Sequence, residues 1–123
     1  MTHEKLIKIA KNGKDPILLD SVRFCKSSVC RLFGLQFRRQ LEPGEGILLA
    51  FGQESVLASS IHMFFVFFPI AAIWINKEGI VTHKALALPW HPYYASPTPA
   101  CYVLEAHPEI LNKINVGDQL EFI

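Results

Sequence analysis

Two side chains that can exchange protons stand out in this sequence, because each lies in an apolar stretch. His62 follows two serines at the start of the longest apolar run, and its imidazole could act as a general base or a ligand. Glu105 lies in a predicted strand of apolar residues, so its carboxylate needs a partner or has to face water. The structural interpretation, which we favour, is a hydrogen-bonded histidine and an outward-facing glutamate.

Three aromatic residues lie in the segment 88–100, which is rich in proline and has no hydrophobic period. Long loops of this kind often bind ligands or cover a core, and rigid aromatic rings suit both roles. The sequence therefore predicts a candidate pocket formed by His62, Glu105, Trp90, Tyr93 and Tyr94.

A basic segment between residues 21 and 41 contains no acidic residue. It suggests a site for an anion or a nucleic acid. Nucleic-acid binding is the weaker alternative, because the chain has a net charge of only +1 and the fold can mix its charges. The candidate anion-binding residues are Arg23, Lys26, Arg31, Arg38 and Arg39.

The sequence shows no motif for a metal, a cofactor or a catalytic triad. The histidines at positions 83, 91 and 107 lack metal-ligand spacing, and the Cys25 and Cys30 pair has no second pair. Neither a Gly-rich phosphate loop nor a G-x-S-x-G turn is present. We therefore expect neither a metal nor another cofactor.

Three cysteines make an odd number, which favours reduced thiols over a disulfide framework. Residues 1–15 also lack the apolar region and small residues of a secretory signal. Both observations predict a cytoplasmic protein.

The run IHMFFVFFPIAAIWI at 61–75 has to be buried, and the other elements are expected to cover it. Its unbroken apolar part from Met63 to Ile75 is shorter than the about 20 residues that a membrane helix needs. Phe, Val, Ile and Trp favour strands, and Pro69 would break a helix. We expect no membrane insertion, and a strand that bends at Pro69.

The remaining patterns predict an α+β protein, a single compact domain over 1–123 with a mostly antiparallel, barrel-like sheet. Strands are expected near 6–9, 17–19, 47–51, 80–88, 101–106 and 120–123. Asn12-Gly13 and Asn76-Lys77-Glu78-Gly79 are expected to form hairpin turns. Two short helices are expected, one over 27–37 and one beginning at Pro108.

Several segments together resemble domain-of-unknown-function family 192, over about residues 20–123. They are GLQFRRQLEPGEGILLAF at 34–51, SIHMFFVFFPI at 60–70, NKEGIV at 76–81, YVLEA at 102–106 and VGDQLEF at 116–122. The resemblance implies a compact, β-rich domain with short helices and no established activity. His62 and Glu105 match the family's SIH and YVLEA elements.

The chain departs from the family around Phe-Pro-Ile. The resemblance implies a basic residue before it and an aspartate after it, where this chain has Phe67 and Ala71. Strand alternation through Pro69 would place both on one face. That face is expected to be buried; the alternative is an exposed apolar surface that forms a homodimer through Phe65, Phe67 and Ala71.

The sequence favours a small non-catalytic binding domain for a small ligand or a protein partner, of otherwise unknown function. The alternatives are a small hydrolase that uses His62 as its base, and anion or nucleic-acid binding through the basic segment.

Overall fold

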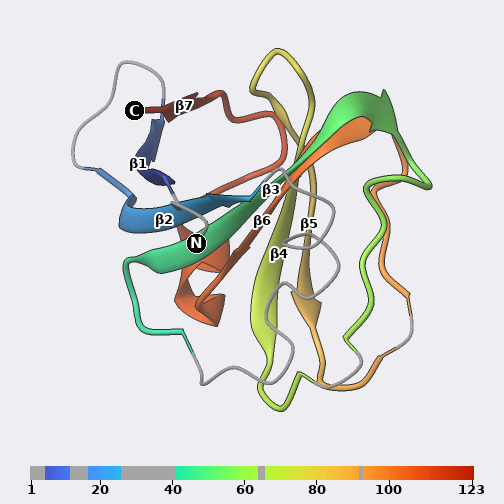
Figure 1. The fold of residues 1–123 in the computed structure, drawn as a ribbon, viewed down its shortest axis with the longest axis horizontal. Coiled ribbons are helices and arrows are strands. Elements are labelled where there is room, and N and C mark those ends of the chain that lie inside the picture. The colour runs from blue at the N-terminus through green and yellow to red at the C-terminus, as the bar shows by residue number, and fades with distance from the viewer. Residues whose placement is uncertain (1–4, 12–16, 26–40, 64–65, 92) are drawn as a thin grey trace.

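The structure is a computed structural model that describes all residues except 1–4, 12–16, 26–40, 64–65 and 92 (Figure 1). The described residues form strands and one short 3₁₀-helix. These elements are β1 (Lys5–Lys11), β2 (Leu19–Cys25), β3 (Glu45–Ser55), β4 (Ile70–Ile75), β5 (Val81–Ala87), β6 (Ala100–Ala106), η1 (Pro108–Asn112) and β7 (Leu120–Phe122).

The strands form one seven-stranded sheet in the order β5-β4-β6-β3-β2-β1-β7. Paired strands are antiparallel, except that β2 and β3 run parallel. The two outer strands approach each other because Ile80, just before β5, forms a bridge with Gln119, just before β7. The Val81 N–H also donates to the Asp118 carbonyl oxygen at 2.9 Å. The sheet therefore curls into a half-barrel, which agrees with the predicted β-rich, barrel-like fold (Figure 1).

Both faces of the sheet are buried, and each has its own apolar core. On the face that η1 covers, Leu48, Ile73 and Leu104 come from three neighbouring strands and pack with Ile110 of η1. On the other face, side chains of the segments 56–69 and 88–99 pack against the sheet around Trp74. Every residue of β4 is buried, because this strand lies between the two cores.

Most of the predicted strands are present. β1 and β2 pair antiparallel as predicted, but β2 begins at Leu19 instead of near residue 17, and the predicted turn at Asn12-Gly13 lies outside the described residues. β4 and β5 are joined by the predicted turn at 76–79. The predicted helix over 27–37 lies outside the described residues. At Pro108 the structure has a five-residue 3₁₀-helix, and the described ranges contain no α-helix. The chain turns again at Asn115–Asp118, where the Asp118 N–H donates to Asn115, so η1 has no room for a longer helix.

The predicted strand through Pro69 is wrong in its first half. Among the described residues before β4, Ile61 forms only an isolated bridge with Tyr94, and β4 begins at Ile70. Proline has no N–H to donate to a ladder, so regular pairing starts after it. Alternation cannot be counted through this point.

The predicted shared face of residues 67 and 71 is therefore also wrong. The Phe67 side chain is 60% exposed, whereas Ala71 is fully buried in the core that η1 covers. Phe65 lies outside the described residues. Of these two described residues, only Ala71 is buried as expected, and Phe67 and Ala71 do not share an exposed face that could form the predicted homodimer surface.

The cysteines differ from the expectation of three reduced thiols. Cys101 is free and buried, but Cys25, at the end of β2, is disulfide-bonded. An odd number of cysteines still allows one pair, so the count was a poor guide. The prediction of a cytoplasmic protein loses this support.

Within the described ranges, no helix is long and apolar enough to span a membrane.

Candidate functional site

A large bulge interrupts β3 and opens a cavity in the sheet. Between two paired positions, Ala50 with Tyr102 and Ser55 with Ala100, β3 advances by five residues while β6 advances by two. Gly52 lies within the extra residues and has a φ of +76°, which other residues rarely adopt. The backbone of β3 therefore leaves its partner here and turns polar side chains toward the gap.

The cavity at this bulge has a volume of about 420 Å³. This volume is within the range of about 300–1,000 Å³ for small-molecule sites. Its walls come from the bulge, the facing part of β6, the end of β2 and the β4–β5 turn. The lining residues are Ala50, Gly52, Gln53, Glu54, Cys101, Tyr102, Phe24 and Lys77. β3 and β6 curl side by side at the upper right of Figure 1.

The polar side of the cavity is held by the β4–β5 turn. The Lys77 backbone N–H donates to Glu54 Oε2 at 2.9 Å. Asn76 Oδ1 accepts the N–H groups of Glu78 at 3.0 Å and of Ile80 at 2.9 Å, which fixes the turn itself. The Glu54 carboxylate is thus oriented by backbone that is already ordered.

The Cys101 thiol in the cavity wall is not activated for nucleophilic attack. Burial raises its pKa, and the charges of Glu54 and Glu78 raise it further, against the opposing effect of Lys77. Burial also raises the pKa of Tyr102, and Cys101 adds to this effect. Both groups therefore keep their protons at neutral pH.

The structure places Glu105 in the interior, which corrects the outward orientation that we favoured. Glu105 lies on β6 between Ile47 of β3 and Ala72 of β4, and it is only 6% exposed. The reason is that both sheet faces are covered, so neither face of β6 is open to water. Burial raises the pKa of the Glu105 carboxyl to about 7.

The other predicted pocket residues lie on the segments that cover the second core. His62 is exposed, and the neighbouring Ile61 exchanges backbone hydrogen bonds with Tyr94 at 2.8 and 2.9 Å. Tyr94 is half-buried, and its hydroxyl accepts the Leu88 N–H at 2.9 Å. Tyr93 is exposed.

Trp90 adopts a left-handed backbone conformation with a φ of 64°, which is uncommon for a bulky residue. Its N–H donates to the Met63 carbonyl oxygen at 2.8 Å, and its ring contacts Phe67 edge-on at 5.6 Å. None of the five predicted pocket residues lines the cavity at the β3 bulge. Their grouping into a pocket remains a prediction.

Of the candidate anion-binding residues, only Arg23 is described, half-buried on β2. Lys26, Arg31, Arg38 and Arg39 lie outside the described residues. In the part of the chain that the structure describes, no group of His, Cys, Asp and Glu could hold a metal ion.

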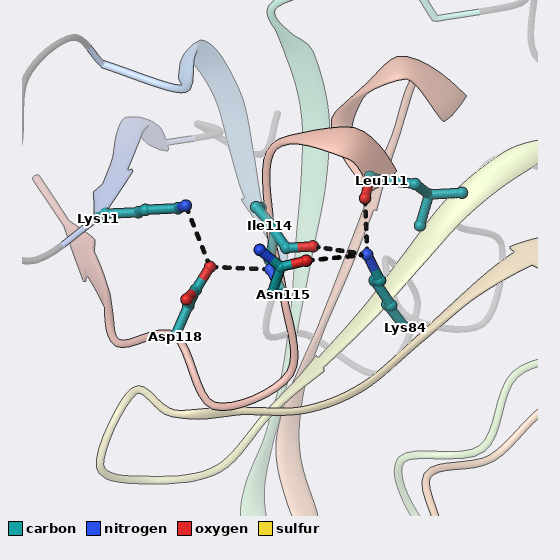
Figure 2. Close-up of polar contacts among 6 residues, drawn as sticks. All are labelled: Lys11, Lys84, Leu111, Ile114, Asn115 and Asp118. Atoms are coloured by element: carbon teal, nitrogen blue, oxygen red, sulfur yellow. Dashed lines mark hydrogen bonds and ion pairs between the residues drawn. The ribbon is translucent and has the colours of Figure 1, made fainter.

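A cluster of charged residues at η1 serves the fold (Figure 2). Lys84 on β5 donates through Nζ to the carbonyl oxygens of Leu111 at 2.7 Å and Ile114 at 3.0 Å, and contacts Asn115 Oδ1 at 3.4 Å. Leu111 lies in η1 and Ile114 just after it, so Lys84 ties the end of η1 to the edge of the sheet.

Asp118 completes this cluster from the next turn. Its Oδ2 accepts the Asn115 N–H at 2.8 Å and lies 3.3 Å from Lys11 Nζ. The Asn115 hydrogen bond is the main cause that lowers the pKa of Asp118, and the Lys11 ammonium adds to it. The cations of the cluster already have intramolecular acceptors, which makes it a poor anion site (Figure 2).

Replacing Lys84 with methionine is expected to lower the free energy of unfolding by about 1.5–3 kcal/mol, the usual value of hydrogen bonds to a charged group. Urea unfolding would measure this loss. Lys113→Met is the control, because the Lys113 ammonium is exposed and only 3.7 Å from Glu109 on the same turn. It should cost at most about 0.5 kcal/mol. Equal losses in the two variants would contradict the role assigned to Lys84.

The bulge residues were not among the predicted site residues, although their segment carries one local signal. The segment FGQES contains a glycine followed by polar residues directly after an apolar strand. A glycine inside a strand pattern often marks a bulge. The expected strand ended at residue 51, just before this point.

The fold and the cavity define a small half-barrel domain of mixed sheet with a candidate ligand site at a strand bulge. The chain belongs to domain-of-unknown-function family 192, described as an uncharacterised ACR, whose profile matches residues 7–122. This result confirms the predicted family and extends the match toward the N-terminus.

Two relatives are named only as UPF0127 proteins. The one from Pyrococcus furiosus is 29% identical over 103 residues, which are 82% of this chain and 85% of the relative. The one from Pyrococcus abyssi is 28% identical over 104 residues, 83% of this chain and 86% of the relative.

Two crystal structures share the fold. A protein of unknown function from Novosphingobium aromaticivorans has a TM-score of 0.80 at 19% identity, covering 96% of this chain and 84% of that one. A protein from Sinorhizobium meliloti, described as a putative transcription regulator, has a TM-score of 0.82 at 24% identity. The match covers 98% of this chain and 94% of that one. At these identities the likeness concerns the fold alone.

Proposed function

We propose that this protein is a non-catalytic binding domain for a small organic ligand, and that the ligand binds in the cavity at the β3 bulge. The observation that carries the proposal is the bulge itself, which opens a cavity of about 420 Å³ between β3 and β6. Bulges are frequent next to functional sites because they redirect side chains.

The chemical character of the walls supports binding. Phe24 and Tyr102 supply aromatic surface, and Gln53 and Glu54 supply hydrogen-bonding groups at the rim. Such a mixture of apolar walls and a few polar groups is typical of small-molecule sites. The protonated Cys101 thiol argues against covalent chemistry in this cavity.

Fragment screening by amide NMR would test the proposal. We expect fragments that bind to shift the amide signals of Gly52, Gln53 and Tyr102. Gln53→Trp should abolish these shifts, because Gln53 is exposed at the rim and the indole can fill the cavity without disturbing the fold. Ala50→Leu, which adds methyl groups to the cavity wall, is a second blocking variant.

Asn112→Trp is the matched control, because Asn112 is exposed on η1 and does not line the cavity. This variant should bind fragments like the unchanged protein. Fragments that bind Gln53→Trp and Ala50→Leu equally well, or that shift the amides of 88–94 instead, would contradict the proposal. The second outcome would direct attention to the predicted pocket around Trp90 and His62.

A cytoplasmic location, the hydrolase alternative with His62 as base and anion binding by the segment 23–39 stay predictions from the sequence. Salt-dependent retention on heparin, lost in Arg23→Gln, would be the expected result of the last alternative.

A further inference from the structure

The cavity lining has one carboxylate, Glu54, and one ammonium group, Lys77. Glu78 does not line the cavity, but its charge also acts on the Cys101 thiol, and the charge of Lys77 has the smallest of the effects on the pKa of that thiol. Burial is the largest cause of that raised pKa, and the two glutamates come next. The charges therefore combine to a negative potential at the thiol.

The Glu54 carboxylate keeps one oxygen available for a ligand. Oε2 accepts the Lys77 N–H at 2.9 Å, and within the described part of the chain the carboxylate has no second hydrogen-bond partner. Oε1 can therefore accept a hydrogen bond from a bound molecule. The turn that holds Oε2 is fixed by Asn76, so the carboxylate loses little freedom on binding.

The cavity also offers aromatic rings. Phe24 and Tyr102 line it, and Tyr102 is held by an edge-on contact with Phe122, with ring centroids 5.2 Å apart. Aromatic rings in a ligand site supply apolar contact surface. The cavity thus combines a carboxylate, which favours an ammonium group, with aromatic surface that can pack against an apolar body.

We propose that the ligand of this cavity is a small organic cation, with its ammonium group at Glu54 and its apolar body against Phe24 and Tyr102. This inference rests on the proposed function, since it assigns a chemical class to the ligand of the same cavity. The side chain of Lys77 then acts against the ligand, because its positive charge lies in the same wall.

Three probes of similar size separate charge from fit: benzylamine, benzyl alcohol and benzoate. Amide NMR titrations should rank benzylamine first and benzoate last. Glu54→Gln should weaken benzylamine about two- to fivefold, as expected for an exposed ion pair, and leave benzyl alcohol unchanged. Lys77→Gln should strengthen benzylamine by a similar factor, because the backbone N–H that holds Glu54 remains.

Both variants change exposed residues, so their folding is not at risk. The binding of benzylamine should also weaken at high salt, and that of benzyl alcohol should not. Equal binding of benzylamine and benzyl alcohol, or no change in Glu54→Gln and Lys77→Gln, would overturn the inference and leave the cavity as a ligand site. If no probe shifted the lining amides, the proposed function would itself fail.

Discussion

Replacing Glu105 with glutamine is expected to remove a large pH dependence of stability. The pKa of this carboxyl rises from 4.5 to about 7 on folding because the side chain is buried. The folded state therefore holds a proton that the unfolded state releases. The corresponding stability is fully present below the unfolded value of 4.5 and is lost as the pH rises through the folded value of about 7.

The size of the effect follows from the two pKa values. Between about pH 5 and about pH 8, the free energy of unfolding of the wild-type protein should fall by roughly 2–3 kcal/mol relative to that of Glu105→Gln, because each unit of pKa shift corresponds to about 1.36 kcal/mol. Urea unfolding of both proteins at several pH values would measure this difference. All other titrating groups are common to both proteins, so their contributions cancel in the difference.

Glu121→Gln on β7 is the matched control, because Glu121 is exposed. Its stability should differ from the wild type by a constant amount at every pH. If the free energies of unfolding of Glu105→Gln and the wild type changed in parallel with pH, ionising the Glu105 carboxyl would cost no stability. That result would contradict its burial.

Replacing Trp74 with alanine should cause the largest loss of stability of any change considered. Trp74 is fully buried at the centre of the core on the second face. Its Nε1–H donates to the Ser59 carbonyl oxygen at 2.8 Å, which ties the covering segment 56–69 to β4. We expect a loss of about 3–5 kcal/mol in the free energy of unfolding.

Trp74→Phe separates the hydrogen bond from the volume of the ring. It keeps an aromatic side chain but leaves the buried Ser59 carbonyl without this donor, for an expected loss of about 1–3 kcal/mol. Trp90→Phe is the control, because Trp90 is 45% exposed. This variant should lose less than about 1 kcal/mol in the free energy of unfolding. If Trp74→Phe and Trp90→Phe were equally stable, the Ser59 hydrogen bond would not hold the covering segment.

Local signals predicted the β4–β5 hairpin well. The β4–β5 turn follows from Asn76 and Gly79, because the asparagine side chain accepts two N–H groups of the turn and the glycine adopts a φ of +83°. The boundaries of β5 and β6 follow from apolar runs that end at turns and prolines. These features depend on residues close together in the sequence.

Features that depend on distant partners could not be predicted. The bulge in β3 is defined by its pairing with β6, about fifty residues later in the chain. The burial of Glu105 depends on segments that cover the second sheet face, which alternation within β6 does not reveal. Consequently the sequence predicted the family and most strands, whereas the cavity became visible only through the sheet register.

The position of β1 between β2 and β7 also has a consequence for protein synthesis. Ile9 pairs with Phe122, so β1 cannot pair with β7 until residues 120–122 have left the ribosome. The ribosome adds about 5–20 residues per second, so one edge of β1, which contains the apolar residues Ile7 and Ile9, stays unpaired for roughly 5–20 s. During that interval the nascent chain is an exposed template for strand addition, and chaperones that shield such edges would protect it.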